Sequence, residues 1–342
     1  MGQLNGNSII SVKNLSVKFS TERGIVHAVR SISFYVRSGE IHGLVGESGC
    51  GKTVTAKTFL RLHDPSRTAV EGRILYGENV EADILALHEK EMQRIRGSEI
   101  SMIFQDPMTS LNPLLTAGEQ IAEMMRLHRG MDRRSAKEEA LKLLNQVGIF
   151  PGEKRYGQYA HEFSGGMQQR VMIAIALSCG PKLLVADEPT TALDVTIQAQ
   201  ILLLIKQLQK DTGMSVLLIT HNFGVVAEIC DRVSVMYAGE IMESGNIGEI
   251  LRSPLHPYTK GLIETIPKSG SRGKPLKTIE GMPPNLLEEI VGCPFAPRCA
   301  FAMEKCSSCK PELKDAGYEH YTACHLVDGT ASREVEPLCR NL

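Results

Sequence analysis

The chain has 342 residues, of which 42% are hydrophobic and 23% charged, a composition typical of globular proteins and sufficient for one large domain with an appendage. Its 38 lysines and arginines nearly balance its 39 aspartates and glutamates, so no overall field would attract it to nucleic acid or to an anionic membrane surface. No apolar run reaches the roughly 18 to 20 residues that span a bilayer, and residues 1–8 lack the apolar stretch of a signal peptide. We therefore expect a cytosolic protein that recognises its partners locally and binds no nucleic acid.

The first hundred residues alternate short β-type runs with turns. This alternation predicts a partly antiparallel sheet. The runs are residues 9–19, 26–36, 41–45 and 72–76. Residues 111–147 instead carry apolar side chains at helical spacing, which predicts a mainly helical insertion.

After residue 165, apolar strands and helices alternate. Residues 183–186 and 216–219 are continuous apolar runs, typical of strands buried on both faces of a parallel sheet, and they flank a helical pattern at 197–208. From Ser253 onward prolines and glycines become frequent and periodicity fades, so we expect a boundary near residue 250 and a loop-rich tail of about 90 residues.

A glycine-rich segment directly follows the apolar run 41–45 and matches the G-x-x-x-x-G-K-[ST] pattern of a phosphate-binding P-loop. Glycines allow successive backbone N–H groups to point at phosphate oxygens, and the following helix adds its positive N-terminal end. Lys52 is expected to reach the β- and γ-phosphates, and Thr53 to place its hydroxyl on Mg²⁺. The predicted ATP-binding residues of this loop are Gly46, Glu47, Ser48, Gly49, Cys50, Gly51, Lys52 and Thr53.

Two acidic residues end the apolar run 183–186. A P-loop enzyme needs a second protein contact to its magnesium ion from an acidic residue at the end of another buried strand. Asp187 is the candidate for this contact. Glu188 is then positioned to polarise the attacking water as a general base.

The segment 163–170, about a dozen residues before the acidic strand, resembles the signature motif of ABC ATPases. The family's usual form begins with leucine and has glutamine in fifth place, whereas this chain has Phe163 and Met167, a variant typical of the peptide-importer branch. Its Ser-Gly-Gly core at a helix N-terminus forms an anion site. The resemblance implies that Ser164, Gly165 and Gly166 contact the γ-phosphate held by the opposite subunit, so that catalysis requires two chains.

Four further residues match motifs of the same family. Gln105 resembles the Q-loop residue that touches Mg²⁺ or water and relays the nucleotide state to the membrane partner. His221 resembles the switch histidine, which contacts the γ-phosphate and orients the general base. Asp194 resembles the D-loop aspartate that helps to align the dimer around the opposite ATP. Phe19 resembles the aromatic residue that stacks on adenine, although an aromatic residue on an early strand belongs to the core at least as often.

The resemblance covers roughly residues 8–330 and implies an α/β fold with a P-loop NTPase core of the RecA-like type. This core would carry an antiparallel β subdomain and an α-helical subdomain at about 107–165. Residues 1–250 would form the ABC nucleotide-binding domain, and 251–342 a loop-rich C-terminal extension that contains a cysteine cluster.

Residues 253–262 and 292–299 resemble the C-terminal extension of importer ATPases for dipeptides, oligopeptides and nickel. Residues 109–113 are similar to the same branch and lie where the family's ATPase touches the coupling helix of the permease. The resemblance implies an ATP-hydrolysing subunit on the cytoplasmic side of the membrane that powers uptake of peptides, or of nickel or another small solute. Its implied partners are a second, homologous but non-identical ATPase subunit, two permease subunits and an extracytoplasmic substrate-binding protein.

Two other classes of ABC protein are compatible with these motifs. Members that act in DNA repair or translation carry a long coiled coil or two cassettes, whereas only about 110 residues separate Thr53 from Ser164 and there is one cassette. A regulatory subunit with little hydrolysis would not need Glu188 and His221. Both alternatives are therefore less favoured than the importer ATPase.

Six of the nine cysteines lie after residue 290. Cys293, Cys299, Cys306 and Cys324 are separated by 5, 6 and 17 residues, in a segment too short of apolar residues for a core of its own. Four thiolates suit a structural zinc ion or a [4Fe–4S] cluster, and unligated thiols are a third alternative. Resemblance to the importer branch favours the cluster. Cys309 is an alternative ligand to Cys306; His256, His320 and His325 are more readily explained as packed or solvated, and Cys339 lies close to the chain end.

Overall fold

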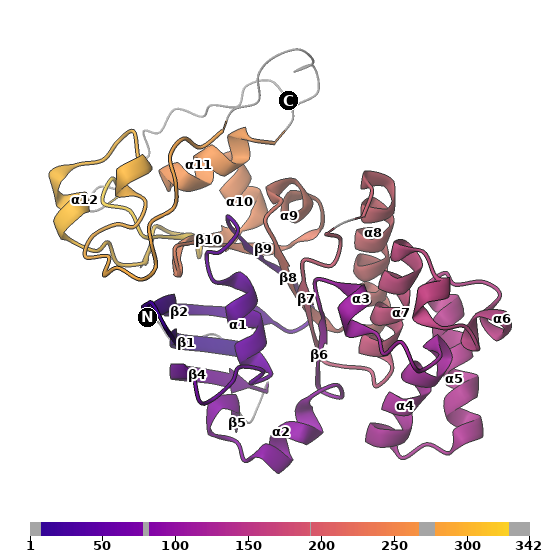
Figure 1. Ribbon diagram of the computed structural model, residues 1–342. Helices are drawn as coiled ribbons and strands as arrows, with labels where there is room; N and C mark the ends of the chain where they lie inside the picture. The colour runs from indigo at the N-terminus through magenta and orange to yellow at the C-terminus, as the bar shows by residue number, and fades with distance from the viewer. Residues whose placement is uncertain (1–7, 78–81, 192, 267–277, 328–342) are drawn as a thin grey trace. The chain divides into compact units, whose positions relative to one another are not determined.

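The computed structural model describes residues 8–77, 82–191, 193–266 and 278–327 (Figure 1). The chain forms two compact units, each assembled from separate stretches of sequence. The first unit comprises Met1–Ile10, Val36–Ile41 and Tyr76–Ile219, and the second comprises Ser11–Tyr35, His42–Leu75 and Thr220–Leu342. The described part of the tail therefore belongs to the same unit as the predicted P-loop.

Three parallel strands form the centre of the first unit. They are β6 (Ile100–Ile103), β7 (Leu183–Asp187) and β8 (Ser215–Thr220), and every residue in them is buried. Parallel strands covered on both faces need such continuous apolar sequence, so the predictions at 183–186 and 216–219 are confirmed. Helices α7 (Gly165–Leu177) and α8 (Val195–Thr212) belong to the same unit.

The predicted helical insertion is confirmed in the first unit (Figure 1). Thr116 caps α4 by accepting a hydrogen bond from the Glu119 N–H, and Asp132 caps α5 in the same way through the N–H groups of Arg134 and Ser135. The two helices pack against one another through their apolar faces. The helical segment consists of α3 (Pro107–Ser110), α4 (Ala117–Arg129), α5 (Arg133–Gln146) and α6 (Gly152–Tyr156).

Shorter elements complete the described part of the first unit. They are β5 (Ala82–Asp83), η1 (Ile84–Ala86), α2 (Glu89–Ile95) and η2 (Ala160–Glu162).

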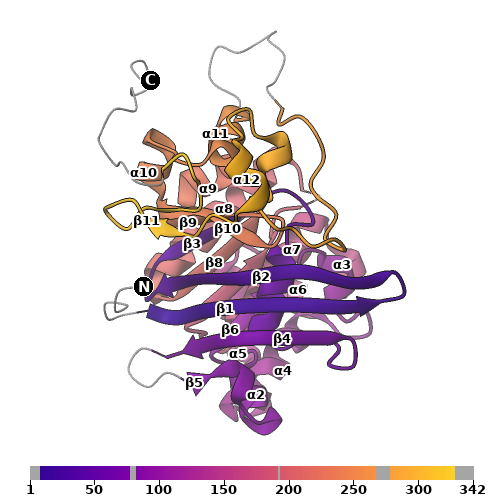
Figure 2. The same ribbon diagram turned by 90° about the vertical axis from the view of Figure 1, so that its left-hand side faces the viewer.

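Long strands from the N-terminal part of the chain lie side by side in the second unit, in the order β2, β1, β4 (Figure 2). Strands β1 (Ser8–Thr21) and β2 (Gly24–Arg37) are joined by a two-residue turn, which makes them an antiparallel hairpin. Strand β4 (Thr68–Tyr76) pairs with the other edge of β1. The antiparallel strands that the alternating pattern predicted are therefore present.

The second unit also holds the strand that leads into the P-loop. Strand β3 (Ile41–Val45) runs parallel to β9 (Arg232–Tyr237), which pairs antiparallel with β10 (Glu240–Asn246). Helices α1 (Lys52–Phe59) and α9 (Phe223–Ile229) belong to this unit.

The C-terminal tail is joined to the sheet by backbone hydrogen bonds. Strand β12 (Tyr321–Thr322) pairs with β10, and β11 (Lys314–Asp315) pairs with β12. Two-residue strands are too short to show a periodic pattern, and for this reason the sequence predicts only loops here. The other tail elements are α10 (Ile247–Arg252), α11 (Pro257–Glu264), η3 (Ala296–Arg298) and α12 (Glu304–Ser308).

None of the helices that the structure describes is long and apolar enough to cross a membrane.

Candidate nucleotide site

The P-loop connects the buried strand β3 to helix α1. Gly49 and Gly51 adopt φ values of 79° and 103°, which a residue with a Cβ atom rarely adopts. A Cβ atom at Gly46 would lie 2.0 Å from the carbonyl oxygen of Met236 on β9. The loop therefore needs its glycines both for its own turns and for its close approach to the neighbouring strand.

The ammonium group of Lys52 is buried and lies over the loop that precedes it. Its Nζ atom donates to the carbonyl oxygens of Gly46 at 2.7 Å and Glu47 at 2.9 Å. Burial raises the pKa of the adjacent Cys50 thiol, although Lys52 acts to lower it. The thiol is therefore neutral at physiological pH, as expected of a small buried residue in the loop.

Two side chains of the C-terminal tail contact Glu47. The backbone N–H of Glu47 donates to the hydroxyl of Tyr258 at 3.0 Å, and the Arg298 guanidinium donates to the Glu47 carboxylate at 2.8 Å. Sequence reasoning did not predict these contacts. Both residues lie in the two segments that resemble the importer extension, but nothing in that resemblance connects them to the P-loop.

In the first unit, the structure places the predicted general base beside the predicted Q-loop residue. The Glu188 carboxylate accepts hydrogen bonds from the Gln105 side-chain amide at 3.1 Å and from the Thr191 hydroxyl at 2.8 Å. Asp187 is buried at the end of β7. Glu188 has a φ of 47°, an uncommon conformation for a residue other than glycine and one that often accompanies function.

The signature motif begins helix α7, with Ser164 as its N-cap residue. Ser164 is exposed and its side chain makes no capping hydrogen bond, so the hydroxyl does not cap the first amides of the helix. A Cβ atom at Gly166 would come within 2.8 Å of the Ile197 side chain, which explains why glycine stands there. Phe163 is buried, and a buried position of this kind suits either phenylalanine or the leucine that is usual in the family.

The remaining motif residues occupy separate positions. Asp194 caps α8 by accepting a hydrogen bond from the Ile197 N–H at 2.9 Å. His221 is exposed just after β8. Phe19 is half-buried and packs nearly perpendicular to the His63 ring, with ring centroids 5.3 Å apart, so it is not a fully buried core residue.

Comparison with known proteins identifies two matching family models. The model described as ABC transporter matches residues 29–191, and the one described as Oligopeptide/dipeptide transporter, C-terminal region, matches residues 242–306. The dipeptide transport ATP-binding protein DppD of Bacillus subtilis is 49% identical over 96% of this chain and 97% of its own. The chain belongs to the ATP-binding subunits of the dipeptide/oligopeptide ABC transporter family. The oligopeptide transport ATP-binding protein OppD of Escherichia coli is 49% identical over 91% of each chain.

Solved structures confirm the predicted fold class of this ABC subunit. The ATP-binding cassette MJ0796, in a dimeric structure bound to ADP and Pi, has a TM-score of 0.61 and 29% identity and covers 70% of this chain and 98% of its own. The cbiO1 protein of Clostridium perfringens, part of the cbiONQ transporter complex, has a TM-score of 0.60 and 28% identity, with coverage of 71% and 90%. As an ABC ATPase, the subunit couples ATP hydrolysis to transport.

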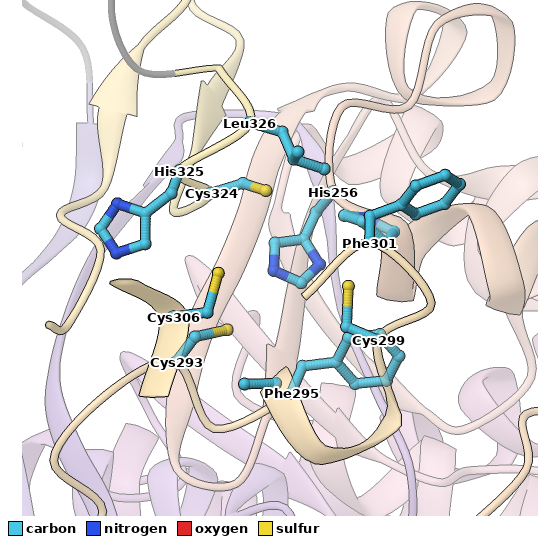
Figure 3. Close-up of a pocket in the computed structure, with 11 residues that line it drawn as sticks. His256, Cys293, Phe295, Cys299, Phe301, Cys306, Cys324, His325 and Leu326 are labelled. Carbon is cyan, nitrogen blue, oxygen red and sulfur yellow. The ribbon is translucent and has the colours of Figure 1, made fainter. Parts of the chain in front are cut away.

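Four cysteines of the ABC subunit's C-terminal extension line one cavity (Figure 3). They are Cys293, Cys299, Cys306 and Cys324, and their sulfur atoms turn toward the cavity (Figure 3). Burial, with a smaller contribution from the neighbouring Cys324 and Cys306, raises the pKa of Cys293 to about 11. Such thiols are protonated until a metal displaces their protons. Cys309 is exposed and does not line the cavity.

The three histidines of this region have other hydrogen-bond partners. His320 contacts the Glu243 carboxylate, His325 contacts the carbonyl oxygen of Cys309, and His256 Nδ1 accepts from the Tyr258 N–H. Among the residues that the structure describes, no group of three or more His, Cys, Asp or Glu side chains is arranged to hold a single metal ion. Cys339 lies outside the described residues.

Proposed function

We propose that this subunit hydrolyses Mg-ATP to power peptide uptake, as one of two ATPase subunits bound to a pair of permease subunits. The contact of Glu188 with Gln105 and Thr191 carries the proposal, because it holds a carboxylate at a strand end beside the residue expected to sense the nucleotide. The exposure of Ser164 at the start of α7 supports the paired arrangement, since an exposed helix N-terminus suits a phosphate supplied by another chain.

The proposed reaction is in-line attack of water on the γ-phosphate, which yields ADP and phosphate. Glu188 orients the water and accepts its proton, and Lys52 exchanges its bonds to the loop carbonyls for phosphate oxygens. His221 contacts the γ-phosphate, and Phe19 stacks on adenine. Ser164, Gly165, Gly166 and Asp194 serve the ATP of the opposite subunit.

A magnesium site is supported by the chemistry of the residues available. Thr53, Gln105 and Asp187 offer hydroxyl, amide and carboxylate oxygens, which are the ligand types that Mg²⁺ prefers. When bound, the ion would neutralise charge on the β- and γ-phosphates. These three residues are therefore the proposed magnesium ligands.

The proposed site of contact with the permease is the segment that follows Gln105. Met108 and Leu114 flank residues 109–113, and their side chains are 75% and 82% exposed. These exposed apolar side chains would be available to a protein partner at this place. The subunit would then lie peripherally on the cytoplasmic side of the membrane, and a substrate-binding protein would deliver cargo to the other side.

Peptides are the proposed cargo because the relatives in Bacillus subtilis and Escherichia coli carry dipeptide and oligopeptide transport in their names. Nickel or another small solute is the alternative. The test is uptake of radiolabelled dipeptide, oligopeptide and nickel by cells that produce either the native chain or Glu188→Gln. We expect cells with the variant to lose peptide uptake and to keep nickel uptake. Cells that lose nickel uptake but take up peptides normally would overturn the peptide assignment.

We also propose that the C-terminal extension binds a [4Fe–4S] cluster through Cys293, Cys299, Cys306 and Cys324. The shared cavity supports this, since the sulfurs turn into it and Phe295, Phe301 and Leu326 wall it with apolar groups. Four thiolates are also the ligand set of a structural zinc ion, which is the alternative, and the resemblance to the importer branch favours the cluster. Its role would be structural, as a clip for a segment with little core.

The cluster is tested by purifying the protein without oxygen and measuring its visible spectrum, iron, acid-labile sulfide and zinc. We expect about four iron and four sulfide per chain. Both should be lost in Cys293→Ser and retained in Cys309→Ser, a matched control because Cys309 lies outside the cavity. Stoichiometric zinc in a colourless protein would show that the site binds zinc and not a cluster. The absence of any metal would contradict both assignments.

A further inference from the structure

The three polar groups of Glu47 in the P-loop are each held by a different residue. Its N–H is bound by Tyr258, its carbonyl by Lys52 and its carboxylate by Arg298. Two of these three residues belong to the C-terminal extension. We propose that Arg298 and Tyr258 are positioning residues for ATP binding: they hold the first half of the P-loop in its binding conformation, so that the extension sets the nucleotide affinity.

Arg298 is fixed in place by contacts that do not involve the P-loop. Its side chain is only 5% exposed, and its guanidinium donates to the carbonyl oxygens of Ile279 and Glu280, both at 2.9 Å. It also donates to the Tyr237 hydroxyl at 3.1 Å and lies over the Tyr237 ring. A guanidinium held on several sides loses little further freedom when it pairs with Glu47.

Tyr258 is fixed by packing. It is fully buried, and its ring lies 4.7 Å from the Tyr237 ring and 5.3 Å from the Phe295 ring, measured between centroids. Its hydroxyl is therefore held still at the Glu47 N–H. A peptide group whose N–H is bound in this way keeps its orientation when the loop is empty.

The ion pair with Arg298 has an electrostatic consequence for the bound nucleotide. Glu47 is an acidic residue within a loop that must bind a polyphosphate, and an uncompensated carboxylate there would repel the phosphates. Arg298 neutralises this charge at 2.8 Å in a largely buried position, where charges interact more strongly than in water. Loss of Arg298 should therefore weaken ATP binding while Glu47 is charged, and should weaken it much less when Glu47 is replaced by an uncharged residue.

This dependence provides the test, in which Mg-ATP affinity of the full chain is measured by displacement of a fluorescent ATP analogue. Arg298→Gln should raise the Kd by about 10-fold, and Glu47→Gln by no more than about 3-fold. The double variant should bind nearly as well as Glu47→Gln alone. Tyr258→Phe, which removes only the hydroxyl, should raise the Kd by about 3-fold.

The matched control is Arg232→Gln. Arg232 is also 5% exposed and pairs with a tail carboxylate, Glu319, at 2.9 Å, but neither residue touches the P-loop. The Kd of the Arg232→Gln variant for Mg-ATP should equal that of the native chain, even if the substitution lowers the melting temperature. The proposal is overturned if Arg298→Gln and Tyr258→Phe both bind ATP like the native chain. It is also overturned if the double variant binds ATP as weakly as Arg298→Gln. A third contradicting result would be that Arg232→Gln weakens ATP binding as much as Arg298→Gln.

Discussion

Replacing Glu188 with glutamine is expected to slow ATP hydrolysis by at least about 100-fold while ATP still binds. Glutamine keeps the size of the side chain and can still accept from Gln105 and Thr191, but it cannot take the proton of the attacking water. The φ of 47° at this residue is compatible with either side chain, so the fold should be unaffected. The variant should therefore accumulate in the ATP-bound state.

Phosphate release by the purified importer, together with the amount of ATP retained after gel filtration, measures this effect. Glu99→Gln is a suitable control, because Glu99 lies at the start of β6, whereas Gln105 lies beyond the other end of that strand. The Glu99 carboxylate pairs with Lys182 and has no predicted role in hydrolysis. Its hydrolysis rate should match that of the native subunit. Hydrolysis by Glu188→Gln within 10-fold of native would show that another group activates the water.

Replacing Glu243 with alanine is expected to destabilise the second unit by about 3 to 5 kcal/mol. Glu243 is fully buried on β10, and its carboxylate accepts from the N–H groups of Leu255 and His256 and from the His320 ring. Alanine would leave all three donors, which are buried or half-buried, without this acceptor. These contacts join α11, β12 and the sheet, so the tail should be the first part to unfold.

Calorimetric melting temperature and the urea midpoint measure the loss, with proteolysis to detect release of the tail. Glu243→Gln, which keeps one acceptor oxygen, should lie between alanine and the native chain. Glu249→Ala provides the control, because Glu249 and its partner Arg252 are 47% and 74% exposed, and such surface pairs contribute little. A melting temperature of Glu243→Ala equal to that of the control would contradict this account of the tail.

The family, the fold class and the nucleotide chemistry could all be predicted from the order of residues along the chain. The P-loop, the acidic strand end and the signature motif each depend on a short run of adjacent residues, since a glycine turn or a helix N-terminus is built locally. The buried parallel strands were equally predictable, because continuous apolar runs leave few alternatives. Gln105 and Glu188, 83 residues apart, were predicted separately, and the structure adds that they touch.

Which residues of the tail lie together becomes visible only in the folded chain. Cys306 rather than Cys309 lines the cavity, because Cys306 is buried within the short helix α12, whereas Cys309 follows the end of that helix and is exposed. The contacts of Tyr258 and Arg298 with Glu47 join residues 211 and 251 positions apart in the chain. Such pairings depend on how loops pack on a sheet, and no local pattern of residues encodes that packing.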